Sequence, residues 1–588
     1  MEQDHRIESV LLADCGSTTT HVSLIDLIGD EFRLVAGAET ATTVEAPWSR
    51  VALGVLEAVR QIEELTGRTL VDSKEQLIFP ERVDGRGVDG FIATVNAAAP
   101  LGMAVVGLIR DLSVESLLKA TDSSYVLVQN VVATDDMPSR GGRGPSTESM
   151  LNELLLNTPD AILIGGGVDG GAVGPVLEMV KDIAAALSGP IAGGRVHVIF
   201  AGNQDARSQV AEVLGDCSSL HVVSNVRPTL EIEDLGPSEK EIDSLYRGLK
   251  MGRVPGFTEL QAWALMPVLP TAEGLGLVLR YLAREYQLDV LGVDVGGAST
   301  NIAGVVGGRY GSTVSGELGV GYSIRKVLDR AGTQRVLRWL PFEMEAEEVD
   351  NAALSKALRP MTVPQTTKDL LLEQAVAREA ISLTLERAVA GWLESASSHR
   401  PGLLPAVDLI VGRGGTLCSA PQPHQAALML LDALQPVGVC TLALDSVSLL
   451  PQLGALAEVQ SLAAAQVLGR DGFLHLGTAI SLVGTGREGA VALRGTMEYE
   501  DGQTIEVEVP YGSLEVMPLP QGKRAVVKLR PGSRFDVGLG KRGKGATTEV
   551  EGGAVGIIID ARGRPLVLPD DEEKRRTKIQ EWMLAMGL

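Results

Sequence analysis

Two segments that lie far apart in the sequence have the residue types of a phosphate-binding turn. They are Asp14-Cys-Gly-Ser-Thr-Thr-Thr20 and Asp294-Val-Gly-Gly-Ala-Ser-Thr-Asn301. In both, an apolar stretch ends in Asp and small residues follow, so backbone N–H groups can approach a triphosphate and hydroxyls can add donors. An Asp at that position can hold Mg²⁺, directly or through water, against the phosphate charge. One such turn is equally well explained as an ordinary hairpin, but two in matching contexts favour a nucleotide site.

A third segment places glycines at the end of another apolar stretch. In Asp408-Leu-Ile-Val-Gly-Arg-Gly-Gly-Thr-Leu417, Gly412, Gly414 and Gly415 stand where a strand is expected to lead into a helix. Glycines there let a nucleoside lie against the backbone, where side chains would collide with it. A plain strand-to-helix turn explains the segment equally well on its own, so its value comes from following the other two. Arg413 stands among these glycines, and we expect it to alter the contacts to a base.

The elements around the two Asp turns repeat each other. Three short strands are predicted within 8–38 and again within 290–314, and in both cases the first strand ends in the Asp. Such a repeat indicates duplication of a half-molecule. Between 85 and 230, apolar strands alternate with helices, which predicts a parallel α/β layer.

The predicted fold is therefore α/β, with duplicated halves and three domains. The first half is expected at 1–285 and contains the inserted α/β region at about 86–235. The second half is expected at 286–475 and carries the second Asp turn and the Gly412–Gly415 segment. Residues 476–588 are expected to form a β-rich domain that closes with a helix.

Charge and cysteine content exclude several classes of function. The net charge of −23 argues against a nucleic-acid or anionic-membrane surface, because such surfaces need clustered Lys and Arg. The four cysteines are far apart and form no C-x-x-C pair, so no structural zinc site is indicated. No apolar stretch is long enough for a membrane span and the first residues lack a signal core, so we expect a cytoplasmic protein.

Other motifs are weaker. Gly165-Gly-Gly-Val-Asp-Gly170 follows a predicted strand and fits a dinucleotide fingerprint. The acidic residue that would bind the ribose of a dinucleotide is not identifiable in the sequence. The favoured interpretation is therefore close packing, or a contact with an anion or a partner protein at the start of the following helix. His21 is expected to be structural or at the surface. Glu373, Arg378, Glu379 and Arg387, on one predicted helix, are expected to form a solvated face.

The order of the three glycine-rich segments is the phosphate-1, phosphate-2, adenosine order of the actin/Hsp70/sugar-kinase superfamily. More specifically, the chain resembles the GlmL family, also called MutL, which is encoded alongside adenosylcobalamin-dependent glutamate mutase and is unrelated to the mismatch-repair protein of the same name. The matching stretches span roughly 8–470 and are Leu12–Thr20, Met103–Asp111, Gly165–Gly171, Ala201–Asn203, Asn225–Pro228, Val293–Thr300 and Gly412–Leu417. The region 476–588 goes beyond the usual extent of the family.

The resemblance implies an actin-like, ribonuclease H-like ATPase that uses ATP and Mg²⁺ and reactivates an adenosylcobalamin-dependent mutase or aminomutase by releasing damaged cobalamin. Its catalytic residues would be Asp14 and Asp294, with Asp14 also at the metal. The nucleotide would be bound by Gly16, Ser17, Thr18, Thr19, Gly296, Gly297, Thr300, Gly412, Gly414 and Gly415. A small-molecule kinase of the same superfamily and a nucleotide-dependent scaffold or filament protein remain as alternatives, and a homo-oligomer is left open.

Overall fold

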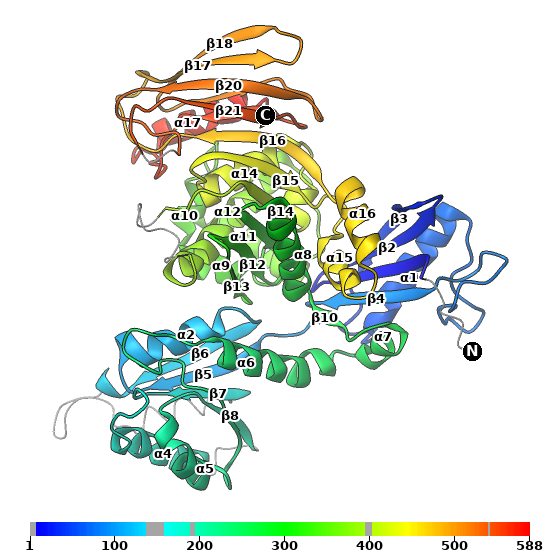
Figure 1. Cartoon of the computed structure of the whole chain (residues 1–588), viewed down its shortest axis with the longest axis vertical. Coiled ribbons are helices and arrows are strands. Elements are labelled where there is room, and N and C mark those ends of the chain that lie inside the picture. Colours follow the sequence, from blue (N-terminus) through cyan, green and yellow to red (C-terminus); the bar gives the residue numbers. More distant parts are fainter. Residues whose placement is uncertain (1–6, 137–157, 189–194, 394–402, 539–540) are drawn as a thin grey trace. The chain divides into compact units, whose positions relative to one another are not determined.

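The computed structural model describes residues 7–136, 158–188, 195–393, 403–538 and 541–588. They form two compact units (Figure 1). The larger unit contains the residues up to Ala97, Val254–Thr313 and Glu317–Leu588, and the smaller contains Ala98–Arg253 with Val314–Gly316. The smaller unit overlaps most of the insert expected at about 86–235, but begins and ends later in the chain.

The first sheet of the larger unit is built around the strand that ends at the Asp14 turn. β1 (Ser9–Cys15) is fully buried, and it pairs antiparallel with β2 (Thr19–Ile28), which in turn pairs antiparallel with β3 (Glu31–Ala41). On its other side β1 pairs parallel with β4 (Gly90–Val95), and β10 (Leu269–Pro270) completes the order β10-β4-β1-β2-β3. The helix α1 (Val51–Thr66) packs against β2 and β3 through its apolar side.

The second sheet repeats this arrangement around the Asp294 turn. β11 (Val290–Val295) pairs antiparallel with β12 (Thr300–Val306) and parallel with β14 (Leu409–Arg413), as β1 does with β2 and β4. With β13 (Arg309–Ser315) and β15 (Gly438–Leu444), the order is β13-β12-β11-β14-β15. Because order and directions recur, the predicted duplication of ribonuclease H-like halves is confirmed, and this is the actin-like fold.

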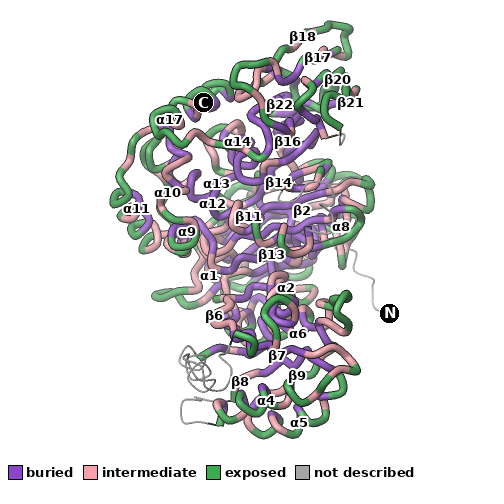
Figure 2. The backbone as a smooth tube through the Cα atoms, turned by 90° about the vertical axis from the view of Figure 1, so that its left-hand side faces the viewer, coloured by how far each residue is buried: buried purple, intermediate pink, exposed green. Residues whose placement is uncertain are grey.

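Helices complete the core of the larger unit. α12 (Thr367–Ala390) packs on β11 and β12 and against α14 (Pro423–Leu434), and α8 (Thr271–Tyr286) packs against α15 (Leu450–Ala457). Other covering helices are α7 (Phe257–Trp263), α9 (Ile324–Ala331), α10 (Thr333–Leu337), α11 (Ala346–Leu358), α13 (Gly415–Cys418) and α16 (Ser461–Asp471). Figure 2 shows the buried residues concentrated along the central strands β11, β14 and β16.

Three C-terminal strands extend the second sheet to eight. β16 (Leu474–Ser481) pairs antiparallel with β15, β22 (Gly556–Asp560) pairs parallel with β16, and β19 (Leu514–Met517) lies at the edge. A separate antiparallel sheet contains β17 (Val491–Tyr499), β18 (Thr504–Pro510), β20 (Arg524–Pro531) and β21 (Ala546–Glu551). α17 (Glu572–Ala585) follows. The β-rich region expected at 476–588 is thus shared between a continuation of the second half and a sheet of its own.

The smaller unit is a five-stranded parallel sheet in the order β6-β5-β7-β8-β9, coloured from cyan to green in Figure 1. Its strands are β5 (Leu101–Gly107), β6 (Val126–Ala133), β7 (Ala161–Gly165), β8 (Val196–Phe200) and β9 (Ser218–Val222). The described helices are α2 (Glu115–Thr121), α4 (Gly174–Leu187), α5 (Arg207–Leu214) and α6 (Gly236–Leu249). The parallel layer predicted for this region is present.

Candidate functional site

The two Asp turns open onto one cavity of about 710 Å³ in the larger unit. Ten of the twelve site residues expected from the sequence line it: Asp14, Gly16, Ser17, Thr18, Thr19, Asp294, Gly296, Gly297, Gly414 and Gly415. The other two are structural. The Thr300 hydroxyl is buried and donates to the Leu318 carbonyl at 2.6 Å, and Gly412 lies within β14 beside the Leu444 side chain.

The two turns contain the same backbone hydrogen bond and lie close to each other. The Gly16 N–H donates to the Thr19 carbonyl at 2.9 Å, and the Gly296 N–H donates to the Ser299 carbonyl at the same distance. A Cβ on Gly297 would lie 2.5 Å from the Thr18 methyl carbon, so only glycine allows the turns to meet this closely.

The next backbone groups in each turn are available to a ligand. Among the described residues, none accepts a hydrogen bond from the backbone N–H groups of Ser17, Thr18 or Gly297, and all three residues line the cavity. Adjacent N–H groups that face one cavity are the usual protein partners of phosphate oxygens.

The third glycine segment approaches the second turn from β14. Gly414 has φ +99°, and a Cβ there would lie 2.1 Å from the Val295 carbonyl oxygen. Both facts require glycine at this position. The close approach places Gly414 and Gly415 on the wall of the cavity beside the Asp294 turn.

Arg413 joins the aspartates of the two halves, a role that the sequence analysis missed. Its Nη2 pairs with Asp14, its Nη1 donates to Asp294 Oδ2 at 2.5 Å, and its Nε donates to Asp445 Oδ2 at 3.1 Å. All four side chains are at most 8% exposed. The strand register accounts for the contact with Asp294: Arg413 lies directly beside Asp294 in the parallel pair of β14 and β11. A sequence-based pairing of these two strands could therefore have predicted it.

The three carboxylates have further partners. Asp14 Oδ1 accepts from the hydroxyls of Thr94 and Thr271, both at 2.7 Å. Asp445 accepts the backbone N–H groups of Leu449 and Leu450 at the start of α15, so the positive end of that helix offsets its charge.

Burial raises the pKa of two of these carboxyls. For Asp445 the raised pKa is about 6, even though Arg413 and the two backbone N–H groups oppose the shift. Burial likewise raises the pKa of Asp294, Arg413 opposes the shift, and the neighbouring Asp14 adds to it. Asp294 and Asp445 thus hold a proton more readily than an exposed aspartate does.

This donor set does not fit a Mg²⁺ ion held by Asp14. Magnesium needs oxygen ligands in near-octahedral geometry, but both Asp14 oxygens already accept hydrogen bonds and the Arg413 guanidinium lies between the two aspartates. In the described part of the chain, no cluster of His, Cys, Asp and Glu has metal-binding geometry. Asp14 is therefore unsuited to the metal role that the resemblance implies.

Other polar side chains line the cavity as well. His21, on β2 opposite Asp14, has its Nε2 3.2 Å from the Thr19 hydroxyl, and burial lowers its pKa. Lys356 on α11 pairs with Glu373 on α12 at 2.8 Å, and the Thr416 hydroxyl donates to the same carboxylate at 3.2 Å. His21, Lys356 and Glu373 all line the cavity.

The solvated face expected on α12 was wrong. Glu379 is fully buried and accepts hydrogen bonds from Trp339 Nε1 at 2.7 Å and Arg338 at 2.8 Å. Arg378 is 7% exposed. Glu379 can be buried because Arg338 and Trp339 donate to it, and Arg378 can be buried because its Nε donates to Asp432 at 2.8 Å.

The segment Gly165–Gly171 is held in place by hydrogen bonds to side chains of the smaller unit. The Asn225 amide donates to the Gly167 carbonyl at 3.0 Å, and the Asn203 amide donates to the Gly171 carbonyl at 3.2 Å. The Gly170 N–H donates to Asp205 at 3.0 Å. Because side chains of the same unit take these backbone groups, the geometry favours close packing over a dinucleotide site.

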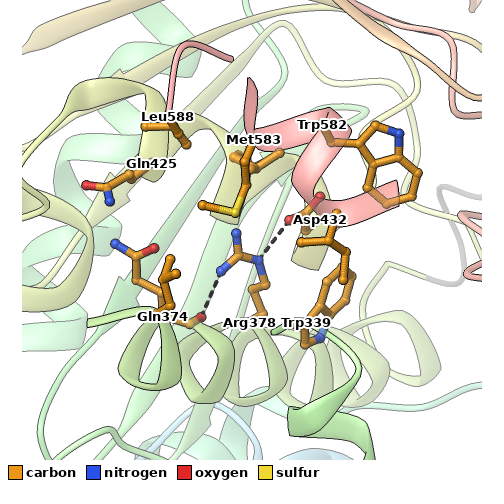
Figure 3. A pocket seen from close by; sticks show the side chains of 11 residues that line it. Trp339, Gln374, Arg378, Gln425, Asp432, Trp582, Met583 and Leu588 are labelled. Carbon is orange, nitrogen blue, oxygen red and sulfur yellow. Dashed lines mark hydrogen bonds and ion pairs between the residues drawn. The ribbon is translucent and has the colours of Figure 1, made fainter. Parts of the chain in front are cut away.

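A second, nearly closed cavity of about 20 Å³ lies beneath α17 (Figure 3). Arg378 lines this cavity and donates hydrogen bonds to the Gln374 carbonyl and to Asp432. Trp339, Trp582 and Met583 line it as well. It has no room for a metabolite. The candidate site is the cavity of about 710 Å³, because the segments with phosphate-binding residue types line it.

The duplicated sheets and the paired turns define a protein of the actin-like class. The chain belongs to the MutL protein family, whose model matches residues 10–471, and this is the GlmL-type family. No curated protein matches. No described helix is long and apolar enough to cross a bilayer.

Several solved structures are similar in fold at low sequence identity. Nucleotide-free acetone carboxylase is 12% identical over 86% of this chain and 81% of that chain, with a TM-score of 0.31. A glycerol dehydratase reactivase is 11% identical over 77% of this chain and 100% of that chain, with a TM-score of 0.29. Component A of (R)-2-hydroxyglutaryl-CoA dehydratase from Acidaminococcus fermentans is 9% identical over 78% and 96%, with a TM-score of 0.25.

Proposed function

We propose that the cavity of the larger unit binds ATP, with the phosphates between the two Asp turns. The observation that supports this most strongly is a pair of turns with the same internal hydrogen bond. They approach each other at Gly297 and Thr18 and bring N–H groups without a protein partner to one cavity. Backbone amides hold phosphate without a basic surface, which accords with the net charge of −23. The adenosine lies toward Gly414 and Gly415.

ATP turnover in this proposal is slow and is coupled to movement of the two halves. Each half supplies one turn and one aspartate, so a bound triphosphate contacts both and its cleavage changes how they are held together. Asp14 and Asp294 orient the attacking water. Mg²⁺ is left out of the proposal because the Asp14 carboxylate is already engaged by Thr94, Thr271 and Arg413.

The partner in this proposal is an adenosylcobalamin-dependent mutase or aminomutase in the cytoplasm, from which the chain releases damaged cobalamin. This part rests on membership of the GlmL-type family over residues 10–471. The nucleotide site supplies the energy source, and the partner class follows from the family alone.

The experiment measures release of inactive cobalamin from a mutase. A glutamate mutase-type enzyme is loaded with hydroxocobalamin and mixed with the full chain and ATP, and free cobalamin is separated and measured by its absorbance. We expect release with ATP, less release with a non-hydrolysable analogue, and none with Asp294→Asn. Asp30→Asn, at an exposed turn outside the cavity, is the matched control and should behave as wild type.

Two outcomes would redirect the proposal. ATP consumption that rises with a small metabolite and ignores the mutase would favour a kinase. Nucleotide-dependent assembly in light scattering, without phosphate release, would favour a scaffold or filament protein. Absence of ATP binding would contradict the proposal as a whole.

A further inference from the structure

Arg413 occupies the position between the two turn aspartates. It extends from the end of β14, in the second half, and reaches Asp14 at the end of β1 in the first half. The same guanidinium contacts Asp294 and Asp445. It is therefore a fixed positive charge at the meeting point of the two halves, on the wall of the cavity.

The guanidinium retains donors for a ligand. An arginine carries five N–H donors in a planar fork, and three of them are used here, one for each aspartate. The other two belong to Nη1 and Nη2, the nitrogens that already contact Asp294 and Asp14. A planar guanidinium matches phosphate oxygens as well as carboxylates, so one group can connect both.

The same arrangement disfavours a divalent cation. An ion at the two aspartates would lie next to the guanidinium, and in a buried site the repulsion between two cations is weakly screened. Asp14 would also have to give up hydrogen bonds from Thr94 and Thr271 at 2.7 Å. Asp445 is occupied by the start of α15.

We propose that Arg413 takes the place of the divalent cation at this phosphate site, so that the protein binds nucleotide phosphates without a divalent metal. The inference rests on the proposed nucleotide function and specifies how that site neutralises phosphate charge. Arg413 then determines that the site takes nucleotide without a divalent metal. Because the same guanidinium also contacts Asp14 and Asp294, nucleotide binding would act on the contact between the halves.

The test is calorimetric titration of ADP into the full chain, once in EDTA and once in Mg²⁺. The wild type is expected to bind with a dissociation constant that differs by less than about threefold between the two conditions. Arg413→Gln should bind at least about tenfold more weakly in EDTA and recover in Mg²⁺. Arg413→Lys keeps the charge and should stay metal-independent, which covers the case in which the glutamine variant does not fold. Arg494→Gln, at an exposed surface pair, is the control.

A second readout uses the metal alone, without nucleotide. Mn²⁺ followed by electron paramagnetic resonance should remain free with the wild type and bind to Arg413→Gln. Wild-type ADP binding that needs Mg²⁺, or Mn²⁺ bound by the nucleotide-free wild type, would overturn the inference and leave the proposed function intact. No ADP binding in either condition would overturn both.

Discussion

Two buried networks of arginine and aspartate lie in the larger unit, and they differ in charge balance and in the space beside them. The cavity network has three aspartates around one arginine: Asp14, Asp294, Asp445 and Arg413. The network beneath α17 has three arginines around two aspartates: Arg378, Arg562, Arg564, Asp432 and Asp560. Asp14, Asp294 and Arg413 line the cavity of about 710 Å³. In the second network, Arg378 and Asp432 line the cavity of about 20 Å³.

The α17 network is satisfied by the protein itself. Asp560 accepts from Arg562 at 2.8 Å and from Arg564 at 2.6 Å, and Arg562 also reaches Asp432 at 2.6 Å. Burial alone would raise the pKa of Asp560, but the two guanidinium groups hold it well below its usual range. In the cavity network the balance is reversed, since burial raises the pKa of Asp294 and Asp445. The two networks differ in sign and in setting: the cavity network has an excess of carboxylates beside open space, and the α17 network has an excess of guanidinium groups beside almost none.

The largest effect is expected from breaking the α17 network. Asp560→Asn leaves Arg562 and Arg564 without their shared carboxylate, and removing one partner of a buried ion pair costs about 3–5 kcal/mol. Urea denaturation should show this loss in the free energy of unfolding. Glu508→Gln, which removes an exposed pair with Arg494, is the control and should cost at most about 1 kcal/mol. Equal effects in the two variants would contradict the account.

An intermediate effect is expected from pH. The raised pKa of Asp445, about 6 against an ordinary 3.8, means that the native state holds its proton more strongly than the unfolded state. Its contribution to stability is full below pH 3.8 and is lost as the pH rises through about 6. Asp560 has a lowered pKa, so its contribution is present above 3.8 and is lost as the pH falls.

The measurement is the free energy of unfolding across this pH range for the wild type and Asp445→Asn. In the wild type, the free energy of unfolding should decline as the pH rises, and this decline should be smaller in the variant. The decline that is left should come from Asp294, whose pKa is also raised. An unchanged pH profile in Asp445→Asn would show that this carboxyl does not titrate as described.

The smallest effect on stability is expected from Asp294→Asn. Three carboxylates share one guanidinium, so removing one charge relieves repulsion while Arg413 keeps Asp14 and Asp445. The free energy of unfolding should change by less than about 1 kcal/mol, in contrast to Asp560→Asn. A loss as large as that of Asp560→Asn would show that the cavity network is structural too.

The two turns and the duplication could be predicted from the sequence because both depend on local residue types. Asp, Gly and small hydroxyl residues after an apolar strand recur at Asp14 and Asp294, and the same hairpin bond is found in both. Thr300 and Gly412 belong to the same motifs but face the protein. Motif position alone could not separate lining residues from buried ones.

Long-range pairing could not be predicted in the same way. Glu379 looks solvated on an isolated helix, and its burial depends on Arg338 and Trp339 from another segment. From the sequence alone, Arg413 has no evident role among the glycines around it. Its role depends on the pairing of β14 with β11, which places it beside Asp294. Likewise, β22 joins the second sheet through parallel pairing with β16, far away in the chain.

Hydrogen–deuterium exchange of the full chain with and without ATP tests the central claim most directly. The account predicts slower exchange at the backbone amides of residues 16–19, 296–299 and 414–416, because the phosphates and the nucleoside contact these segments. Asp30→Asn should show the same protection. ATP-dependent protection confined to residues 165–171 of the smaller unit, or no protection at all, would contradict a nucleotide site between the two Asp turns.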